Sequence, residues 1–172
     1  MQVIIADPPI LELYPEPQPV GVPPFLEHVL AGLRERKPIL YCWGDKLYNP
    51  RGGMIPPELM VHEQVHSDQQ LRPDTISVER WWLAYIDNPQ FRLSEEIPAH
   101  RAEYTCLKGI TRDRNALHQG LHRIALRLSS PLYGSMIDYE HAKHAVAGDQ
   151  VTPGYRDDPE LQVQRQRFRP TS

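Results

Sequence analysis

Residues 58–70 of the chain read ELMVHEQVHSDQQ and contain the pattern His-Glu-x-x-His at His62, Glu63 and His66. Pro57 precedes this stretch, and proline is well tolerated in the first turn of a helix, where backbone N–H groups have no helical partner. We therefore predict a helix that begins near Pro57 and carries the motif. In such a helix, residues four apart lie on one face, one turn from each other.

This spacing suits a metal ion. Two imidazoles on one helical turn can both reach a zinc ion at the usual Zn–N distance of about 2.0–2.1 Å. Zinc lowers the pKa of a bound water to about 7, and a neighbouring carboxylate then takes the proton as the water attacks a carbonyl. The motif thus predicts His62 and His66 as metal ligands and Glu63 as the general base.

A simpler interpretation is a solvent-facing amphipathic helix with two ordinary histidines. Leu59, Met60 and Val61 precede the motif and give this helix an apolar side. Asp68 departs from the apolar residue usual at its position, and we expect it to hydrogen-bond a ligating histidine.

Two other histidine pairs at helical spacing serve as a control: His118 with His122, and His141 with His144. Neither pair has an adjoining glutamate. We therefore interpret both pairs as surface or boundary residues rather than metal ligands.

Composition fits one globular domain and argues against several classes of protein, among them nucleic-acid-binding, membrane and disulfide-rich proteins. The chain has 172 residues, of which 40% are hydrophobic and 24% charged, with a formal net charge of -3. This balance predicts neither a nucleic-acid-binding nor a membrane surface. The N-terminus shows no signal-peptide pattern, and the two cysteines, Cys42 and Cys106, indicate no disulfide framework. We expect a cytoplasmic protein, although a protein of a phage particle would look the same.

Hydrophobic patterning predicts a mostly helical α+β fold. A proline-rich segment is expected at residues 1–24, a catalytic domain at 25–148 and a disordered tail at 149–172. Short strands are expected at residues 3–5, 39–43 and 46–49, with Gly44-Asp45 as the hairpin turn between the last two. Helices are expected at residues 25–36 and 75–86, at 95–110 after a Ser94 cap, after an Asp113 cap, and from Ser135-x-x-Asp138 to Gly148.

A third metal ligand is sought on the helix expected at 95–110. Glu96, His100 and Glu103 share one face of it, at i, i+4 and i+7. If this helix begins at residue 95, Glu95 and Glu96 lie in its first turn. The helix dipole favours an acid there even without any metal.

HEQVH followed some thirty residues later by Glu96-x-x-Ala99 resembles the HExxH…E zinc metallopeptidases, the gluzincin side of the zincins. The resemblance implies Glu96 as the third ligand, and it places His100 where the family often has an aspartate. It also implies a zincin-like domain with a small antiparallel sheet, the hairpin at 39–49, packed on the zinc helix, with a substrate peptide adding to its edge strand. Small bacterial and phage proteins of this type are similar around Tyr85-x-x-Asn-Pro and in the segment 130–134.

The expected function is therefore a Zn²⁺-dependent metallopeptidase acting on a peptide or protein substrate. The alternatives are a catalytically silent zincin-like structural or interaction module, for example of a phage-type particle, and a metal-independent helical binding module. Tyr104, His100 and Tyr133 are the candidates for stabilising the oxyanion. Trp81 and Trp82 are expected in the core rather than in a pocket.

Overall fold

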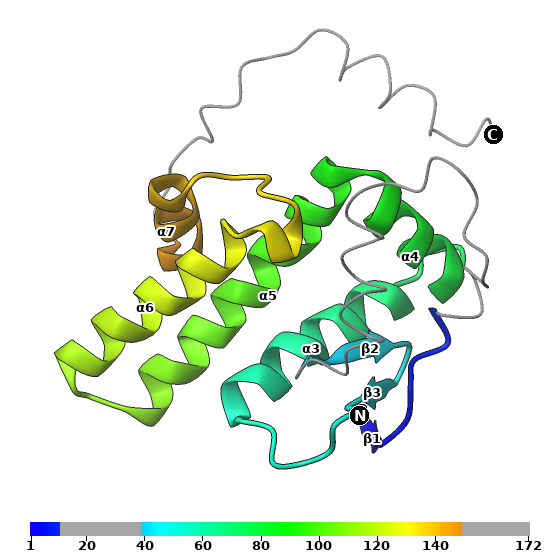
Figure 1. Ribbon diagram of the computed structural model, residues 1–172, viewed down its shortest axis with the longest axis horizontal. Coiled ribbons are helices and arrows are strands. Elements are labelled where there is room, and N and C mark those ends of the chain that lie inside the picture. The colour runs from blue at the N-terminus through cyan, green and yellow to red at the C-terminus, as the bar shows by residue number, and fades with distance from the viewer. Residues whose placement is uncertain (11–38, 149–172) are drawn as a thin grey trace, which may run out of the picture.

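A computed structural model describes residues 1–10 and 39–148, which form a mostly helical α+β fold, as predicted. Helix α5 runs diagonally through the molecule, in contact with α3 on one side and with α6 and α7 on the other (Figure 1). The helices are α3 (Pro57–Leu71), α4 (Val78–Asp87), α5 (Pro89–Ile110), α6 (Arg114–Leu128) and α7 (Tyr139–Ala147), with a short 3-10 helix η1 (Pro131–Tyr133) between α6 and α7.

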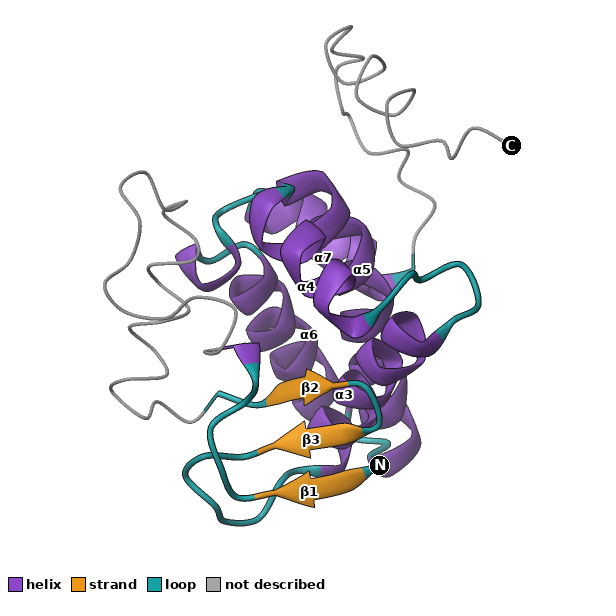
Figure 2. Ribbon diagram, turned by 90° about the vertical axis from the view of Figure 1, so that its right-hand side faces the viewer, coloured by secondary structure: helices purple, strands orange, loops and turns teal. Residues whose placement is uncertain are grey.

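The sheet has three strands in the order β1-β3-β2 (Figure 2): β1 (Gln2–Ile4), β2 (Tyr41–Trp43) and β3 (Lys46–Tyr48). The predicted hairpin forms, and Gly44 adopts the positive φ, 58°, that a two-residue turn with glycine first requires. The hairpin strands β2 and β3 pair antiparallel, as expected, and β1 adds to β3 in parallel, so the sheet as a whole is mixed.

The sheet packs on α3 through β2, as expected of the hairpin. The side-chain amide of Gln70 accepts a hydrogen bond from Gly44 N at 2.7 Å and donates one to Cys42 O at 3.0 Å. The indole of Trp82 donates to the same carbonyl at 3.1 Å. Helices α3 and α4 are thereby fixed to the backbone of β2.

Helix α5 begins earlier than predicted. Its N-cap is Asn88, whose side chain accepts hydrogen bonds from the N–H groups of Gln90 and Phe91, and Pro89 occupies the first turn. The predicted cap, Ser94, instead lies within the helix and donates to Phe91 O. Glu96 consequently lies two turns into α5, so a favourable interaction with the helix N-terminus does not account for it.

The other described helices begin close to their predicted starts. Pro57 starts α3, Ser77 caps α4 and Asp113 caps α6. Helix α7 is capped by Asp138 alone, since Ser135, at φ 52°, lies outside the helix, so the predicted Ser135 contribution is wrong.

Two apolar clusters lie on opposite sides of α5. The first contains Trp81, Trp82 and Tyr85 of α4 packed on the sheet, and the second joins α6 to α7. Trp81 and Trp82 are therefore core residues, as predicted, although both also line the cavity described below. The interface between α3 and α5 separates the clusters and contains mainly polar side chains.

Three predictions lie outside the described residues: the helix at 25–36, most of the proline-rich segment at 1–24, and the tail at 149–172. Within residues 1–10 and 39–148, no helix combines the length and apolar character needed to cross a lipid bilayer.

Candidate metal centre

The buried face of α3 is entirely polar. Its buried residues are His62, Glu63, His66, Ser67, Gln69 and Gln70. Of the apolar residues before the motif, Leu59 and Met60 are only half-buried and Val61 is exposed, so the expected apolar side does not form the buried face. His62 and His66 are only 3% and 6% exposed, which excludes a solvent-facing helix with ordinary histidines. Burying such groups costs free energy unless they are paired, so their partners identify the site.

Helix α5 supplies the partners. Its buried face carries Glu96, His100 and Glu103, as their spacing predicted, together with Glu95 and Arg92. Glu96 and His100 are 1% and 0% exposed. The two polar faces meet between the two apolar clusters, where bulk water has little access.

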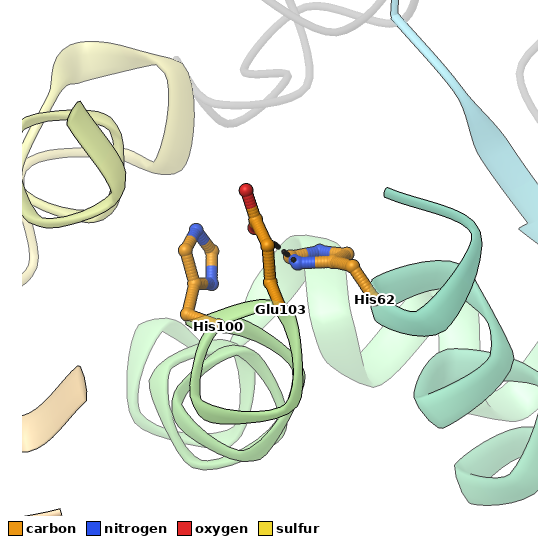
Figure 3. A group of neighbouring side chains, drawn as sticks. All are labelled: His62, His100 and Glu103. Atoms are coloured by element: carbon orange, nitrogen blue, oxygen red, sulfur yellow. Dashed lines mark hydrogen bonds and ion pairs between the residues drawn. The ribbon is translucent and has the colours of Figure 1, made fainter. Parts of the chain in front are cut away.

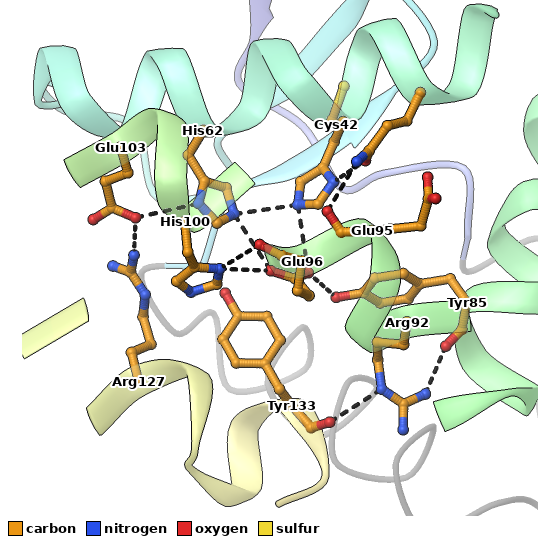
Figure 4. Close-up of polar contacts among 12 residues, drawn as sticks. Cys42, His62, Tyr85, Arg92, Glu95, Glu96, His100, Glu103, Arg127 and Tyr133 are labelled. Carbon is orange, nitrogen blue, oxygen red and sulfur yellow. Dashed lines mark hydrogen bonds and ion pairs between the residues drawn. The ribbon is translucent and has the colours of Figure 1, made fainter. Parts of the chain in front are cut away.

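His62, His66 and Glu96 converge on one point. Figure 4 shows His62 and Glu96 facing each other there. Nε2 of His66 lies 3.2 Å from Nε2 of His62 and 3.4 Å from Oε1 of Glu96. Nε2 of His62 lies 3.6 Å from Oε2 of Glu96. The structure therefore brings the three sequence-predicted ligands together, from positions on two helices.

Three observations fit a divalent cation at this point. Two ligand atoms of a tetrahedral zinc lie about 3.3–3.4 Å apart, close to the distances found here. Oε2 of Glu96 is buried and accepts no hydrogen bond in the described part of the chain. Within that part, neither Glu63 nor Glu96 forms an ion pair with a lysine or arginine, so two buried carboxylates lack a permanent cation.

Both candidate ligand histidines are held through Nδ1, the ring nitrogen that faces away from the candidate metal position. Nδ1 of His62 donates to Oε2 of Glu103 at 3.2 Å, because a carboxylate accepts only. Nδ1 of His66 donates to Oε1 of Gln69 at 2.8 Å, because the amide nitrogen of Gln69 is engaged with Glu95 O. Each Nε2 is then left facing the candidate metal position, as in most metal-binding histidines.

The electrostatics of the metal-free site are unusual. Burial lowers the pKa of His62 to about 3 and raises the pKa of Glu63 to about 7. Burial opposes protonation of His66 as well, but the Glu96 carboxylate raises the pKa of His66 to about 9. Burial would raise the pKa of Glu96, yet the adjacent histidines hold it well below its usual range. A positive charge between His66 and Glu96 is thus strongly favoured.

A second group of potential ligands consists of His62, His100 and Glu103 (Figure 3). Oε2 of Glu103 already accepts hydrogen bonds from His62 and from the Arg127 guanidinium. A cation at this second position would lie beside that guanidinium, and like charges repel. The first group is therefore the better metal position.

A cavity of ≈ 80 Å³ opens beside the first group and has room for water. His62, Glu63, His66 and Glu96 form its polar wall. The remaining wall is mainly apolar and aromatic: Ile39, Leu40, Tyr41, Cys42, Gln70, Trp81, Trp82, Tyr85, Leu132 and Tyr133. Glu63, the predicted base, thus shares one cavity with the three predicted ligands.

Only one of the three oxyanion candidates lines this cavity. Tyr133 extends from η1 toward His100 and Glu96 (Figure 4), and its carbonyl accepts a hydrogen bond from Arg92 Nε at 3.0 Å. The other two candidates are not among the residues that line it. His100 is fully buried, and Tyr104 packs against the apolar cluster of α6 and α7.

Several supporting contacts were missed by sequence reasoning. Tyr85 donates a hydrogen bond to Oε1 of Glu96, and Arg127 binds Glu103. Gln69 holds His66, whereas Asp68, predicted for such a role, is exposed and accepts from Gln64. Gln69 lies three residues after His66 on the same helical face, so this spacing could have predicted the contact between them.

The control histidines behave as predicted: His118, His122, His141 and His144 are all exposed.

Comparisons of the chain with protein-family models, with curated proteins and with solved structures found no match. Any inference about the chemistry of the site therefore depends on the residues of the site itself.

Proposed function

We propose that this protein is a zinc-dependent metallopeptidase of the HExxH…E type, with His62, His66 and Glu96 as ligands and Glu63 as the general base. The observation that carries the proposal is the meeting of these four buried residues at one cavity between α3 and α5. A purely structural zinc prefers four protein ligands and needs no adjacent base, whereas a catalytic zinc keeps one position open.

Zinc bound there would acidify a water molecule and polarise the substrate carbonyl. Glu63 accepts a proton from the attacking water as the water oxygen bonds to the carbonyl carbon. The same carboxyl then gives this proton to the amide nitrogen, and the C–N bond breaks. The pKa of about 7, caused by burial, suits a group that both accepts and donates a proton near neutral pH. Tyr133 is the candidate donor to the oxyanion.

A peptide substrate would approach along β2, an edge strand of the sheet in the described part of the chain. The Cys42 carbonyl and the Gly44 amide are already bonded to Gln70 and Trp82, so pairing there is blocked. Leu40 and Tyr41 line the cavity, and we place the peptide beside them.

The test combines metal analysis with cleavage of a broad peptide library by the full chain. Wild type and Glu63→Gln should each hold one zinc, and the variant should lose about 10²–10⁴-fold in cleavage rate, the usual contribution of a general base. His62→Ala should lose the zinc. Glu58→Gln, in the first turn of the same helix, is the matched control and should keep both properties.

Two results would contradict the proposal. Zinc in both proteins with no cleavage by either would favour the silent structural or interaction module. The absence of zinc from the wild type would leave a metal-independent helical protein.

A further inference from the structure

A second carboxylate of α5 supports His62 from outside the group of proposed ligands. Oε2 of Glu103 accepts from His62 Nδ1 at 3.2 Å and from the Arg127 guanidinium. Glu103 is 3% exposed, so these contacts form away from bulk water, where they are strong. Because the carboxylate fixes the proton on Nδ1, His62 presents the lone pair of Nε2 to His66 and Glu96.

His100 does not perform this task, although it lies between Glu96 and Glu103 on the same face. Its Nδ1 donates to the backbone carbonyl of Glu96 at 2.9 Å. Its Nε2 is buried without a hydrogen-bond partner in the described part of the chain. The acceptor for His62 therefore comes from Glu103, almost one turn further along α5.

The same helix contains a closely similar pair that does not touch a histidine. Glu95 is 5% exposed and accepts from Arg72 Nη2 at 3.1 Å and from the Trp81 indole at 2.9 Å. The side chains of Arg72 and Arg127 are 38% and 30% exposed. Both glutamates are thus buried carboxylates paired with a half-exposed arginine. The difference is that Glu95 holds a core tryptophan and Glu103 holds a proposed ligand.

We propose that Glu103, itself held by Arg127, is a positioning residue that orients His62 for a divalent metal ion. This inference rests on the metal site of the proposed function. Partners of this kind raise the basicity of a ligating histidine and fix its ring. Arg127 keeps the carboxylate in place, so α6 contributes to the site through α5 without touching the metal.

The experiment measures Zn²⁺ affinity of the full chain by chelator competition, and the visible absorption bands of the Co²⁺-loaded protein. Glu103→Gln should weaken Zn²⁺ binding about 10–100-fold and alter the Co²⁺ bands, as expected when a ligand loses its charged partner. Arg127→Met should act in the same direction with a smaller loss. Glu95→Gln and Arg72→Met are the matched controls, which should lower the melting temperature but leave affinity and bands unchanged.

The outcomes separate this inference from the proposed function. Unchanged affinity and bands in Glu103→Gln would overturn the role of Glu103 and leave the metal site standing. Equal losses in the Glu103 and Glu95 variants would also overturn it, since general destabilisation would then explain both. A wild type that binds neither ion would overturn the proposed metal site itself. Should Glu103→Gln fail to fold, Arg127→Met tests the same contact with Glu103 in place.

Discussion

At the scale of residues, the choice between the two potential ligand groups depends on which side chains share the ion with His62. Glu96→Gln keeps the size of the side chain and removes its charge, so we expect Zn²⁺ affinity to fall by more than the roughly 10–100-fold typical of losing a ligand's neighbour. His100→Ala should retain stoichiometric zinc, because His100 belongs to the second group only. Zinc titration of both variants checks this, and the opposite ranking would assign the ion to His62, His100 and Glu103.

Sequence reasoning at this scale succeeded where spacing within one helix was sufficient. His62 with His66, and Glu96 with His100 and Glu103, were placed on shared faces by helical periodicity alone. The residues that hold Nδ1 of each histidine were not predicted correctly, since Asp68 was expected and Glu103 and Gln69 are found. Arg127 lies 24 residues from Glu103 in the chain, and no local pattern fixes how α6 packs against α5.

At the scale of elements, the amide of Gln70 joins α3 to β2. Gln70→Ala would leave the buried Gly44 N–H without its acceptor, and we expect a loss of about 1–3 kcal/mol in the free energy of unfolding. Gln64→Ala is the control on the same helix. Gln64 is exposed and its side chain donates to the exposed Asp68, so this variant should change stability by less than about 0.5 kcal/mol. Urea unfolding measures the free energy of unfolding of both variants. Equal changes in the two would show that the hydrogen bonds of Gln70 do not stabilise the fold.

Element positions were predictable wherever a cap was unambiguous. Asp113 was identified as a cap, and the hairpin followed from Gly44-Asp45. The start of α5 was misplaced because Ser94 is followed by two acids, Glu95 and Glu96, which are typical of a first helical turn. The parallel pairing of β1 was also missed, since pairing between distant segments leaves no periodic signal.

At the scale of the whole molecule, the metal-free fold holds a proton where we place the ion. Nε2 of His66 faces Nε2 of His62 at 3.2 Å and Oε1 of Glu96 at 3.4 Å. Burial alone would lower the pKa of His66, but Glu96 raises it to about 9, above the usual histidine value of 6.5. This protonation therefore stabilises the metal-free fold fully below pH 6.5, and the contribution is lost as the pH rises through about 9.

Zinc must displace that proton, so its affinity should rise with pH, by up to about tenfold per unit while one proton is released. The increase in melting temperature on adding zinc should consequently be larger at pH 8 than at pH 6, whereas Glu96→Gln should show little increase at either pH. Thermal unfolding with zinc and with a chelator at both pH values measures this difference. An increase that is equal or larger at pH 6 would mean that proton and metal do not compete for His66, and that the ion binds elsewhere.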